Sequence, residues 1–494
     1  MKAINNLNII WFRNDLRLYD NKVLCSAIAD AQQRNAAVVG LFIATPDTWQ
    51  QHNMAAIKQD FIRRRVVCLK QELAQLNIVL HTLEGTDYAA TCDVFAQVQQ
   101  HYKIKVFVQT DYELDERLRD HKVTACLESA GNELISFDSQ CIMPPGSICT
   151  QQQTMYKVFT PFKRNWLSRL AEQGVQCLPK PKTLNVANGQ LVDLHLTAYS
   201  TMQNGDNSSI KWPVEQNEII DQLRDFCQHK VADYEKKRDF PAISATSKLA
   251  AYLAIGAISA GQCVARLQLE ANDTWSLAKT GAEVWLSELI WREFYKHILV
   301  AYPDLIKHHA FQTETDNIRW SQDQTLFNAW CSGNTGYPLV DAAMRQLNQT
   351  GWMHNRLRMI TASFLVKDLQ LDWRLGERYF MSKLIDGDFS ANNGGWQWAA
   401  STGTDAVPYF RIFNPITQSE RFDPKGDFIR LYVPELASLD AKAIHWPHKN
   451  TQLSTAISDI KSYAAPIVDH AQARKITLAL FAEVKKTDES TSKD

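Results

Sequence analysis

The chain of 494 residues lacks the patterns that mark several common protein classes. Its ten cysteines are scattered and none stands in a CxxC pair, which argues against zinc ribbons, thioredoxin chemistry and a compact iron–sulfur binding run. No uninterrupted apolar run reaches the ~18 residues that a bilayer-spanning helix needs. The apolar stretch Ile9–Phe12 meets Arg13 too soon to serve as a signal peptide. We therefore expect a cytoplasmic protein with reduced cysteines, no metal site and no membrane partner.

A strong net charge is absent as well. The 53 basic and 54 acidic residues leave a formal net charge of −1, so composition alone gives no sign of nucleic-acid binding. Any attraction to phosphates has to come from a local basic face. The length allows two or more domains, and a content of 45% hydrophobic residues is ordinary for a globular protein. We expect a monomer.

The first third of the chain alternates short β-branched runs with charged helical stretches. The runs are Asn8–Phe12, Ala37–Ile43, Ile78–His81, Lys105–Val108 and Leu134–Phe137. This alternation predicts βαβ units, and hence an α/β domain over residues 1–142 around a parallel five-stranded sheet. The first run leads into Arg13–Arg17 and not into GxGxxG. The domain is therefore Rossmann-like without the dinucleotide fingerprint, and we do not expect it to hold a flavin by the usual route.

The rest of the chain changes character twice. Residues 143–215 are rich in Pro, Gln, Asn, Gly and Ser, which predicts an interdomain connector, with a helix over Met155–Ala171 inside it. From 216 to 484 the pattern of long amphipathic helices predicts a larger all-α domain. The short polar stretch 485–494 is expected to be a disordered tail.

Two segments of the helical part carry the most information about function. If Gly351–Asp368 is one helix, Trp352, Asn355, Arg356 and Met359 share a face that offers a ring, an amide, a cation and a thioether. An amphipathic helix with its ring and thioether in the core is the alternative. The acids, asparagines and glycines of Asp386–Trp398 break the helical period, which favours a backbone bent around a ligand.

These segments resemble the cryptochrome/photolyase family, and most closely the class I cyclobutane pyrimidine dimer photolyases of bacteria. The resemblance extends to Trp11–Arg17, Trp285–Phe294, Thr335–Arg345 and Arg411–Pro415. It implies an all-α FAD-binding catalytic domain and a light-dependent DNA repair lyase that acts on UV-damaged DNA. In such an enzyme, excited FADH⁻ donates an electron to a pyrimidine dimer rotated out of the duplex, and the cyclobutane bonds split.

The resemblance also implies which residues hold FAD. They are Tyr234, Thr246, Ser247, Lys248, Leu249, Trp285, Trp352, Asn355, Arg358, Asp386, Asp388 and Asn392. Hydroxyls at 246 and 247, with a helix starting near Lys248, would bind the pyrophosphate, although a simple helix N-cap is the alternative. Asn392 is expected at the flavin N5, and Asp386 is expected to pair with Arg358 under the ring. A tight turn is the alternative reading of Asp386–Asp388.

A second set of residues is expected to contact the lesion. Trp291 and Trp398 would form flat walls, Met359 an adaptable floor, and Glu288 and Asn355 the hydrogen-bonding groups. The alternative for Glu288 and Trp291 is a surface glutamate above a core tryptophan on one helix. Arg238 and Arg356 are the candidates for the flanking phosphates. Enzymes for (6-4) photoproducts carry a histidine pair where this chain has His354–Asn355, so the sequence favours cyclobutane dimers.

The resemblance further implies an electron route and an antenna. Trp396, Trp373 and Trp320 match the tryptophan chain of the family, and Glu288 and Asn392 complete the catalytic set. The antenna contacts are expected at His52, Asn53, Met54, Asp115, Glu116 and Lys307. They suit 5,10-methenyltetrahydrofolate, but Asp115 stands where the folate pattern often has Asn, so a deazaflavin remains an alternative.

Two other functions compete with repair of cyclobutane dimers in duplex DNA. A cryptochrome-type blue-light photoreceptor is disfavoured by Asn392, which plant cryptochromes replace with Asp, and by the short tail. A relative that prefers single strands is disfavoured by Glu288 and Trp398, the positions at which its pocket usually departs.

Overall fold

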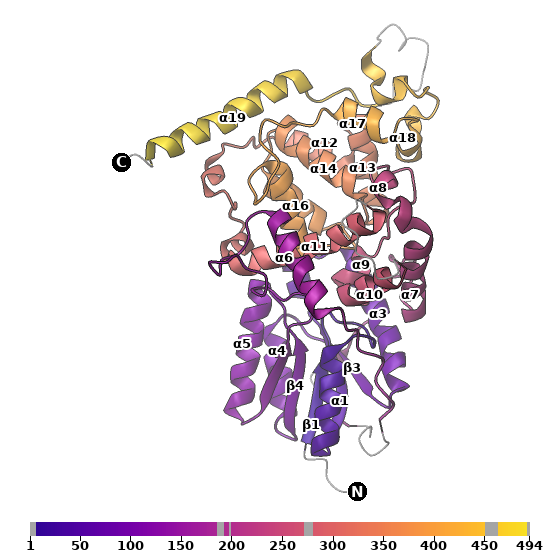
Figure 1. The fold of residues 1–494 in the computed structure, drawn as a ribbon, viewed down its shortest axis with the longest axis vertical. Helices are drawn as coiled ribbons and strands as arrows, with labels where there is room; N and C mark the ends of the chain where they lie inside the picture. The colour runs from indigo at the N-terminus through magenta and orange to yellow at the C-terminus, as the bar shows by residue number, and fades with distance from the viewer. Residues whose placement is uncertain (1–5, 185–191, 197–198, 271–279, 450–462, 492–494) are drawn as a thin grey trace. The chain divides into compact units, whose positions relative to one another are not determined.

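The computed structural model describes residues 6–184, 192–196, 199–270, 280–449 and 463–491. The chain divides into two compact units (Figure 1). One, which we call the sheet unit, comprises residues 1–156, 160–232 and 247–301. The other, the helical unit, comprises residues 157–159, 233–246 and 302–494. Among the described residues no helix is both long and apolar enough to span a bilayer.

The sheet unit is built on five parallel strands, as predicted. In the sheet the order is β5-β4-β1-β2-β3-β6, and only β6 runs antiparallel, beside β3. The strands are β1 (Asn6–Trp11), β2 (Ala37–Ala44), β3 (Val79–Glu84), β4 (Lys103–Gln109), β5 (Glu133–Phe137) and the two-residue β6 (Ser200–Thr201). The sequence did not indicate β6, because two residues carry no detectable period.

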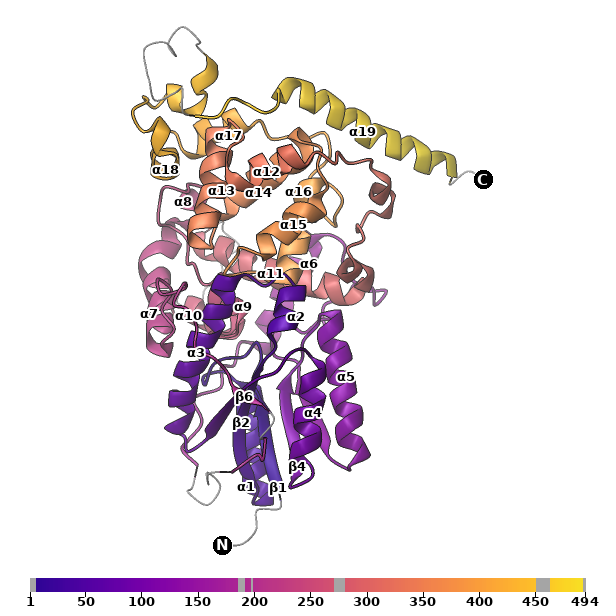
Figure 2. The ribbon, with the colours of Figure 1, turned by 180° about the vertical axis from the view of Figure 1, so that it is seen from behind.

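Helices cover both faces of this sheet. Along β1, Leu7 and Ile9 pack in one core with residues of α4 and α5, whereas the side chain of Asn8 donates to Ala27 O on α1 at 2.8 Å. Since side chains alternate along a strand, α1 lies on the face opposite α4 and α5, as Figures 1 and 2 show from two sides. The helices are α1 (Lys22–Arg34), α2 (Pro46–Gln51), α3 (Ala56–Ala74), α4 (Ala89–Val98), α5 (Leu114–Ser129) and α6 (Phe159–Gln173).

The sheet unit also contains helices that the sequence assigned to the all-α domain. They are α7 (Gln216–Asp225), the π-helix η1 (Phe226–Lys230), the 3₁₀ turn η2 (Val231–Asp233), α9 (Ala250–Ala254), α10 (Ala260–Glu270) and α11 (Gly281–Ala301). Buried Glu293 on α11 accepts the backbone N–H of Met143 at 3.1 Å and the indole N–H of Trp166 at 2.6 Å. The division into compact units therefore does not coincide with the expected boundary at residue 216.

The helical unit contains no named strand among its described residues. Its elements are α8 (Tyr234–Lys237), η3 (Pro303–Lys307), η4 (Thr313–Asn317), α12 (Gln324–Ser332), α13 (Pro338–Thr350), α14 (Asn355–Ser363), η5 (Phe364–Asp368), α15 (Trp373–Met381), α16 (Phe389–Ala400), α17 (Pro415–Phe422), α18 (Asp427–Tyr432), η6 (Pro434–Leu436), η7 (Ala443–His445), η8 (Pro447–Lys449) and α19 (His470–Thr491). One apolar core joins α13 to α16, with buried Met353, Trp373 and Trp396. Helix α19 continues to Thr491, through most of the segment expected to be a disordered tail.

Candidate functional site

The predicted single helix over Gly351–Asp368 is wrong. Helix α13 ends at Thr350, and the next residue, Gly351, adopts a left-handed conformation with φ 67° that suits a glycine after a helix C-terminus. The next helix begins only at Asn355, where His354 Nδ1 accepts the Arg356 N–H at 3.2 Å as an N-cap. Trp352 therefore precedes α14 and does not share its face with Asn355.

The two informative segments meet through two contacts, an ion pair between Arg358 and Asp386 and a backbone hydrogen bond between Ile385 and Gly351. The Arg358 guanidinium on α14 pairs with Asp386 at 2.8 Å and donates from Nε to Met353 O at 2.9 Å. The backbone N–H of Ile385 donates to Gly351 O at 2.8 Å. The turn before α14 and the turn before α16 are thus held against each other, and the expected Arg358–Asp386 pair is present.

Residues Asn392 to Gly395 of the second segment lie inside a helix, contrary to the expected break in helical period. Asp388 caps α16 by accepting the Ala391 N–H at 3.0 Å, so the paired acids occupy the turn before the helix. On α16, the side-chain amide of Asn392 donates to Glu377 O on α15 at 3.0 Å. This contact turns the amide oxygen of Asn392 away, and that oxygen accepts no hydrogen bond from the described part of the chain.

Three further candidates of the helical unit lie on α14 and α16 at half-buried or exposed positions. Asn355 is exposed at the start of α14, Met359 is half-buried one turn later, and Trp398 is half-buried on α16. Arg356, a candidate phosphate ligand, already has a partner within the chain, because its guanidinium pairs with Asp239 at 2.8 Å. Sequence reasoning missed Asp239, for which the only local signal is its place directly after Arg238.

The three tryptophans of the expected electron route come from adjoining elements. Trp396 on α16 and Trp373 at the start of α15 are buried, and Trp320 is half-buried. Gly376 lets α15 approach α16 closely, since a Cβ there would lie 2.1 Å from the Trp396 ring. The Ser321 N–H donates to Gln370 O at 2.8 Å, which holds the Trp320 segment beside the start of α15.

The sheet unit holds another part of the candidate set on α11. Glu288 and Trp291 are both half-buried and stand one turn apart on this helix, as predicted. Trp291 contacts the rings of Phe294 and Tyr295, each with a centroid separation of 5.5 Å. Trp285 is buried, and its ring contacts that of Phe226 at a centroid distance of 4.9 Å.

The candidate phosphate-binding turn also lies in the sheet unit from residue 247 onward, while Tyr234 and Thr246 belong to the helical unit. Lys248 has a left-handed backbone with φ 53°, and the five-residue helix α9 begins at Ala250, two residues later than expected. The Leu249 N–H donates to Ser247 Oγ at 3.4 Å. Burial, and then the charge of Lys230, lowers the pKa of Lys248. A bound anion near the ammonium would oppose that shift.

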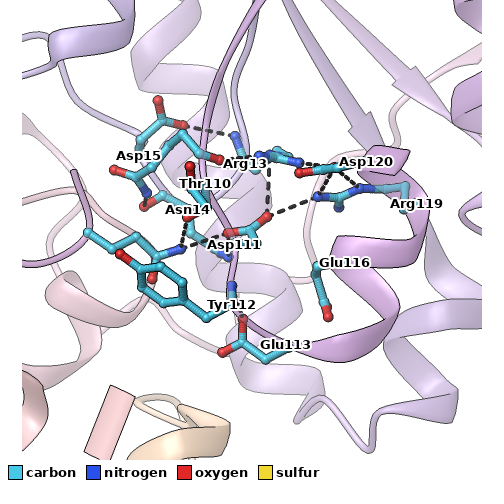
Figure 3. Close-up of polar contacts among 12 residues, drawn as sticks. Arg13, Asn14, Asp15, Thr110, Asp111, Tyr112, Glu113, Glu116, Arg119 and Asp120 are labelled. Atoms are coloured by element: carbon cyan, nitrogen blue, oxygen red, sulfur yellow. Dashed lines mark hydrogen bonds and ion pairs between the residues drawn. The ribbon is translucent and has the colours of Figure 1, made fainter. Parts of the chain in front are cut away.

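The segments that follow β1 and β4 carry a cluster of paired charges. Figure 3 shows Arg13 and Arg119 joined to Asp120 and to buried Asp111 by ion pairs of 2.6 to 3.3 Å. Both guanidinium groups also stack on Trp11, at 4.8 and 4.9 Å from its centroid. In open α/β sheets ligands usually bind where the strand order reverses, and here that place is occupied.

The expected antenna residues of the sheet unit gather beside this cluster. His52 lies 2.9 Å from Asp115 and 3.7 Å from Glu116, and Tyr88 donates to the Glu116 carboxylate at 2.7 Å. The second Glu116 oxygen is buried and has no hydrogen-bond partner in the described chain. Lys307 belongs to the helical unit, where its ammonium pairs with Asp304 at 3.1 Å. Asn53 and Met54 occupy the turn after α2, and Asn53 has a left-handed backbone with φ 52°.

Comparison with known proteins identifies the family. A model of the FAD binding domain of DNA photolyase matches residues 285–483, and a DNA photolyase model matches residues 8–182. This chain belongs to the DNA photolyase family. It is 47% identical to deoxyribodipyrimidine photo-lyases of Vibrio cholerae, over 97% of this chain and 100% of that one, and of Escherichia coli, over 97% and 99%. Among solved structures, a Synechocystis cryptochrome matches with a TM-score of 0.82 at 26% identity, over 97% of this chain and 100% of that one. A photolyase-type fold is therefore confirmed, and it is shared by a cryptochrome.

The stability of this photolyase should depend on pH through His354. Burial, partly opposed by Asp239, lowers the pKa of His354 to about 4 from 6.5. An unfolded chain takes up a proton below pH 6.5, and the folded ring resists protonation until about pH 4. Its stabilising contribution is complete above pH 6.5 and is lost as the pH falls. Between pH 7 and pH 4.5, the unfolding free energy measured in urea should fall by roughly 2–3 kcal/mol more in the parent than in His354→Asn. The variant keeps an N-cap acceptor. Equal pH dependence of the variant and the parent would contradict this.

Proposed function

We propose that this chain is a deoxyribodipyrimidine photo-lyase, a light-dependent repair enzyme that splits cyclobutane pyrimidine dimers in UV-damaged DNA. The observation that carries the proposal is the near full-length similarity, at 47% identity, to bacterial proteins of that name. The fold alone does not separate repair from photoreception, because a cryptochrome has it too. Bound FAD in its reduced form supplies the electron that opens the dimer on illumination and recovers it afterwards.

The residues present fit this cofactor. The free amide oxygen of Asn392 can accept a hydrogen bond from N–H at the flavin N5, because the amide nitrogen is held by Glu377 O. The Arg358–Asp386 pair holds the turns that start α14 and α16, the helix with Asn392. The turn Ser247–Leu249, with Lys248, suits the pyrophosphate. Trp352 and Trp285 are proposed as contacts of the same cofactor.

We further propose that the chain binds the lesion with aromatic rings and a few hydrogen-bonding groups. Trp291 and Trp398 stack on the two bases, and the flexible thioether of Met359 packs beside them. Asn355 and Glu288 bind the polar edges of the dimer, which are left without water once the bases leave the stack. These contacts rest on the family resemblance, and the exposure of Asn355 and the half-exposure of Met359 and Trp398 support them.

Repair should fail when the carboxylate on α11 is removed. The purified, FAD-loaded and chemically reduced protein is expected to remove dimers from irradiated DNA under blue light and not in the dark. Glu288→Ala should lower the rate at limiting DNA by about 10- to 100-fold, the effect of losing a hydrogen bond to a charged group, while FAD content is retained. Glu283→Ala, on the same helix, is the control and should repair normally. Unchanged repair in Glu288→Ala removes that residue from the site; a light-responsive flavin without any repair by the parent favours the photoreceptor.

We also propose that Trp396, Trp373 and Trp320 pass electrons inward from the surface. Trp396→Phe should slow photoreduction of the oxidised, flavin-bound protein at least about tenfold, because phenylalanine is far harder to oxidise than tryptophan. Repair by prereduced protein should stay within about twofold of the parent. Trp330→Phe is the control, since Trp330 is buried in the same core with its ring 6.1 Å from that of Trp396. Equal photoreduction rates in the parent and in Trp396→Phe would exclude the route.

A folate is our proposal for the antenna, bound at His52, Asn53, Met54, Asp115 and Glu116. A pterin ring presents neighbouring N–H and amino donors, which suit a carboxylate with one unpartnered buried oxygen, as Glu116 has. A deazaflavin placed where dinucleotides usually bind would have to displace the ion-paired cluster of Figure 3. This supports 5,10-methenyltetrahydrofolate over a deazaflavin. Lys307 is proposed as a contributor from the helical unit.

Removing the carboxylate charge should weaken folate binding. Glu116→Gln should lower the affinity for methenyltetrahydrofolate about tenfold, as followed by its absorption and by energy transfer to the flavin. Glu128→Gln, an exposed position on the same helix α5, is the control. Tighter binding of a deazaflavin than of the folate by the parent would overturn the choice. We also propose a monomeric state, a cytoplasmic location and a functional division into an antenna domain at 1–142 and an FAD domain at 216–484.

A further inference from the structure

Arg356, near the start of α14, is held by an aromatic ring and by a carboxylate. Its guanidinium lies over the Phe422 ring on α17, 4.5 Å from the centroid, and Nη2 pairs with Asp239 at 2.8 Å. Its Nε is buried and makes no hydrogen bond in the described part of the chain. The ring fixes the plane of the guanidinium, and Asp239 supplies its countercharge.

Asp239 closes a short basic run. Lys236 and Lys237 are exposed at the end of α8 and are followed by half-buried Arg238. Phe240, directly after Asp239, contacts Phe422 at a centroid distance of 6.4 Å, so the segment is anchored beside the ring that carries Arg356. The side chain of Asp239 is 34% exposed, against 17% for Arg356. The acid is therefore the partner with more freedom to move away.

A cation that is paired with a carboxylate of its own chain can distinguish damaged from undamaged DNA. Phosphates are present in damaged and undamaged duplexes alike, so contacts to them add affinity without selecting a lesion. A duplex anchored by a captured dimer holds its flanking phosphate near Arg356 at high effective concentration, and that phosphate can replace the carboxylate. An undamaged duplex has no such anchor, and its phosphates meet an Arg356 whose charge is already neutralised by Asp239.

We propose that Asp239 is a specificity-determining residue, an internal countercharge that Arg356 exchanges for a DNA phosphate only when a lesion is bound. The carboxylate thereby suppresses binding to undamaged DNA. This inference rests on the proposed function, because it takes DNA as the ligand of Arg356.

The test is DNA binding by the FAD-loaded protein in the dark. Asp239→Asn should raise the affinity for undamaged duplex about tenfold at low salt, with a slope of log affinity against log salt steeper by up to ~0.9, the value for one more phosphate contact. Affinity for a duplex with a single dimer should change by less than about threefold, so selectivity falls. In an Arg356→Gln background the Asp239→Asn substitution should have no effect, because the two residues act as a pair.

Asp233→Asn controls for the loss of one negative charge, since Asp233 lies at the start of the same segment and pairs with Lys237 at 2.6 Å. FAD content is measured for each variant. Weaker binding of both duplexes by Asp239→Asn would overturn the proposal. Asp239 would then serve only to hold the Arg356 side chain in position. An equal gain from Asp233→Asn would overturn it too. If the parent itself shows no preference for dimer-containing DNA, the proposed function fails, and the effect of Asp239→Asn on undamaged DNA still reports on the ion pair.

Discussion

The junction between Arg358 and Asp386 is the contact on which the candidate site of the helical unit depends. Asp386 is almost wholly buried, with 4% of its side chain exposed, so its charge needs a partner. Arg358 provides it and also binds Met353 O, while the Ile385 N–H binds Gly351 O. The turns before α14 and α16 cannot move apart without breaking the Arg358–Asp386 ion pair and the Ile385–Gly351 hydrogen bond. The side chains that the two helices carry therefore keep their mutual positions.

Both helices start from side-chain caps, and this decides which polar atoms remain for a ligand. His354 accepts the Arg356 N–H in the first turn of α14, and Asp388 accepts the Ala391 N–H in the first turn of α16. Glu377 O takes the amide nitrogen of Asn392 and leaves its oxygen for a donor. The polar atoms left for a ligand therefore belong to groups whose other atoms already have hydrogen-bond partners. These partners fix the direction of each remaining lone pair.

Local pattern predicted the five parallel strands, α11 with Glu288 and Trp291, and the Arg358–Asp386 pair, because each depends on periodicity or on the family motif. It did not predict that Gly351 ends a helix, since a glycine inside an apolar pattern looks the same whether its φ is negative or positive. It placed the glycines of α16 outside a helix, although packing overrides their poor propensity. Asp239 could not be found, because its partner lies 117 positions away in the sequence and only the fold brings them together.

Internal pairing of cations explains how a chain with a net charge of −1 is compatible with binding DNA. Arg356 and Arg358 in the helical unit each face a carboxylate, and Arg13 and Arg119 in the sheet unit share two. A paired cation attracts a distant phosphate weakly, since the field of the ion pair falls off faster than that of a single charge. Under the exchange proposed for Arg356, binding requires a change of partner at short range, where the geometry of the bound DNA decides the outcome. Selectivity for a distorted duplex follows more readily from such a surface than from one that is uniformly basic.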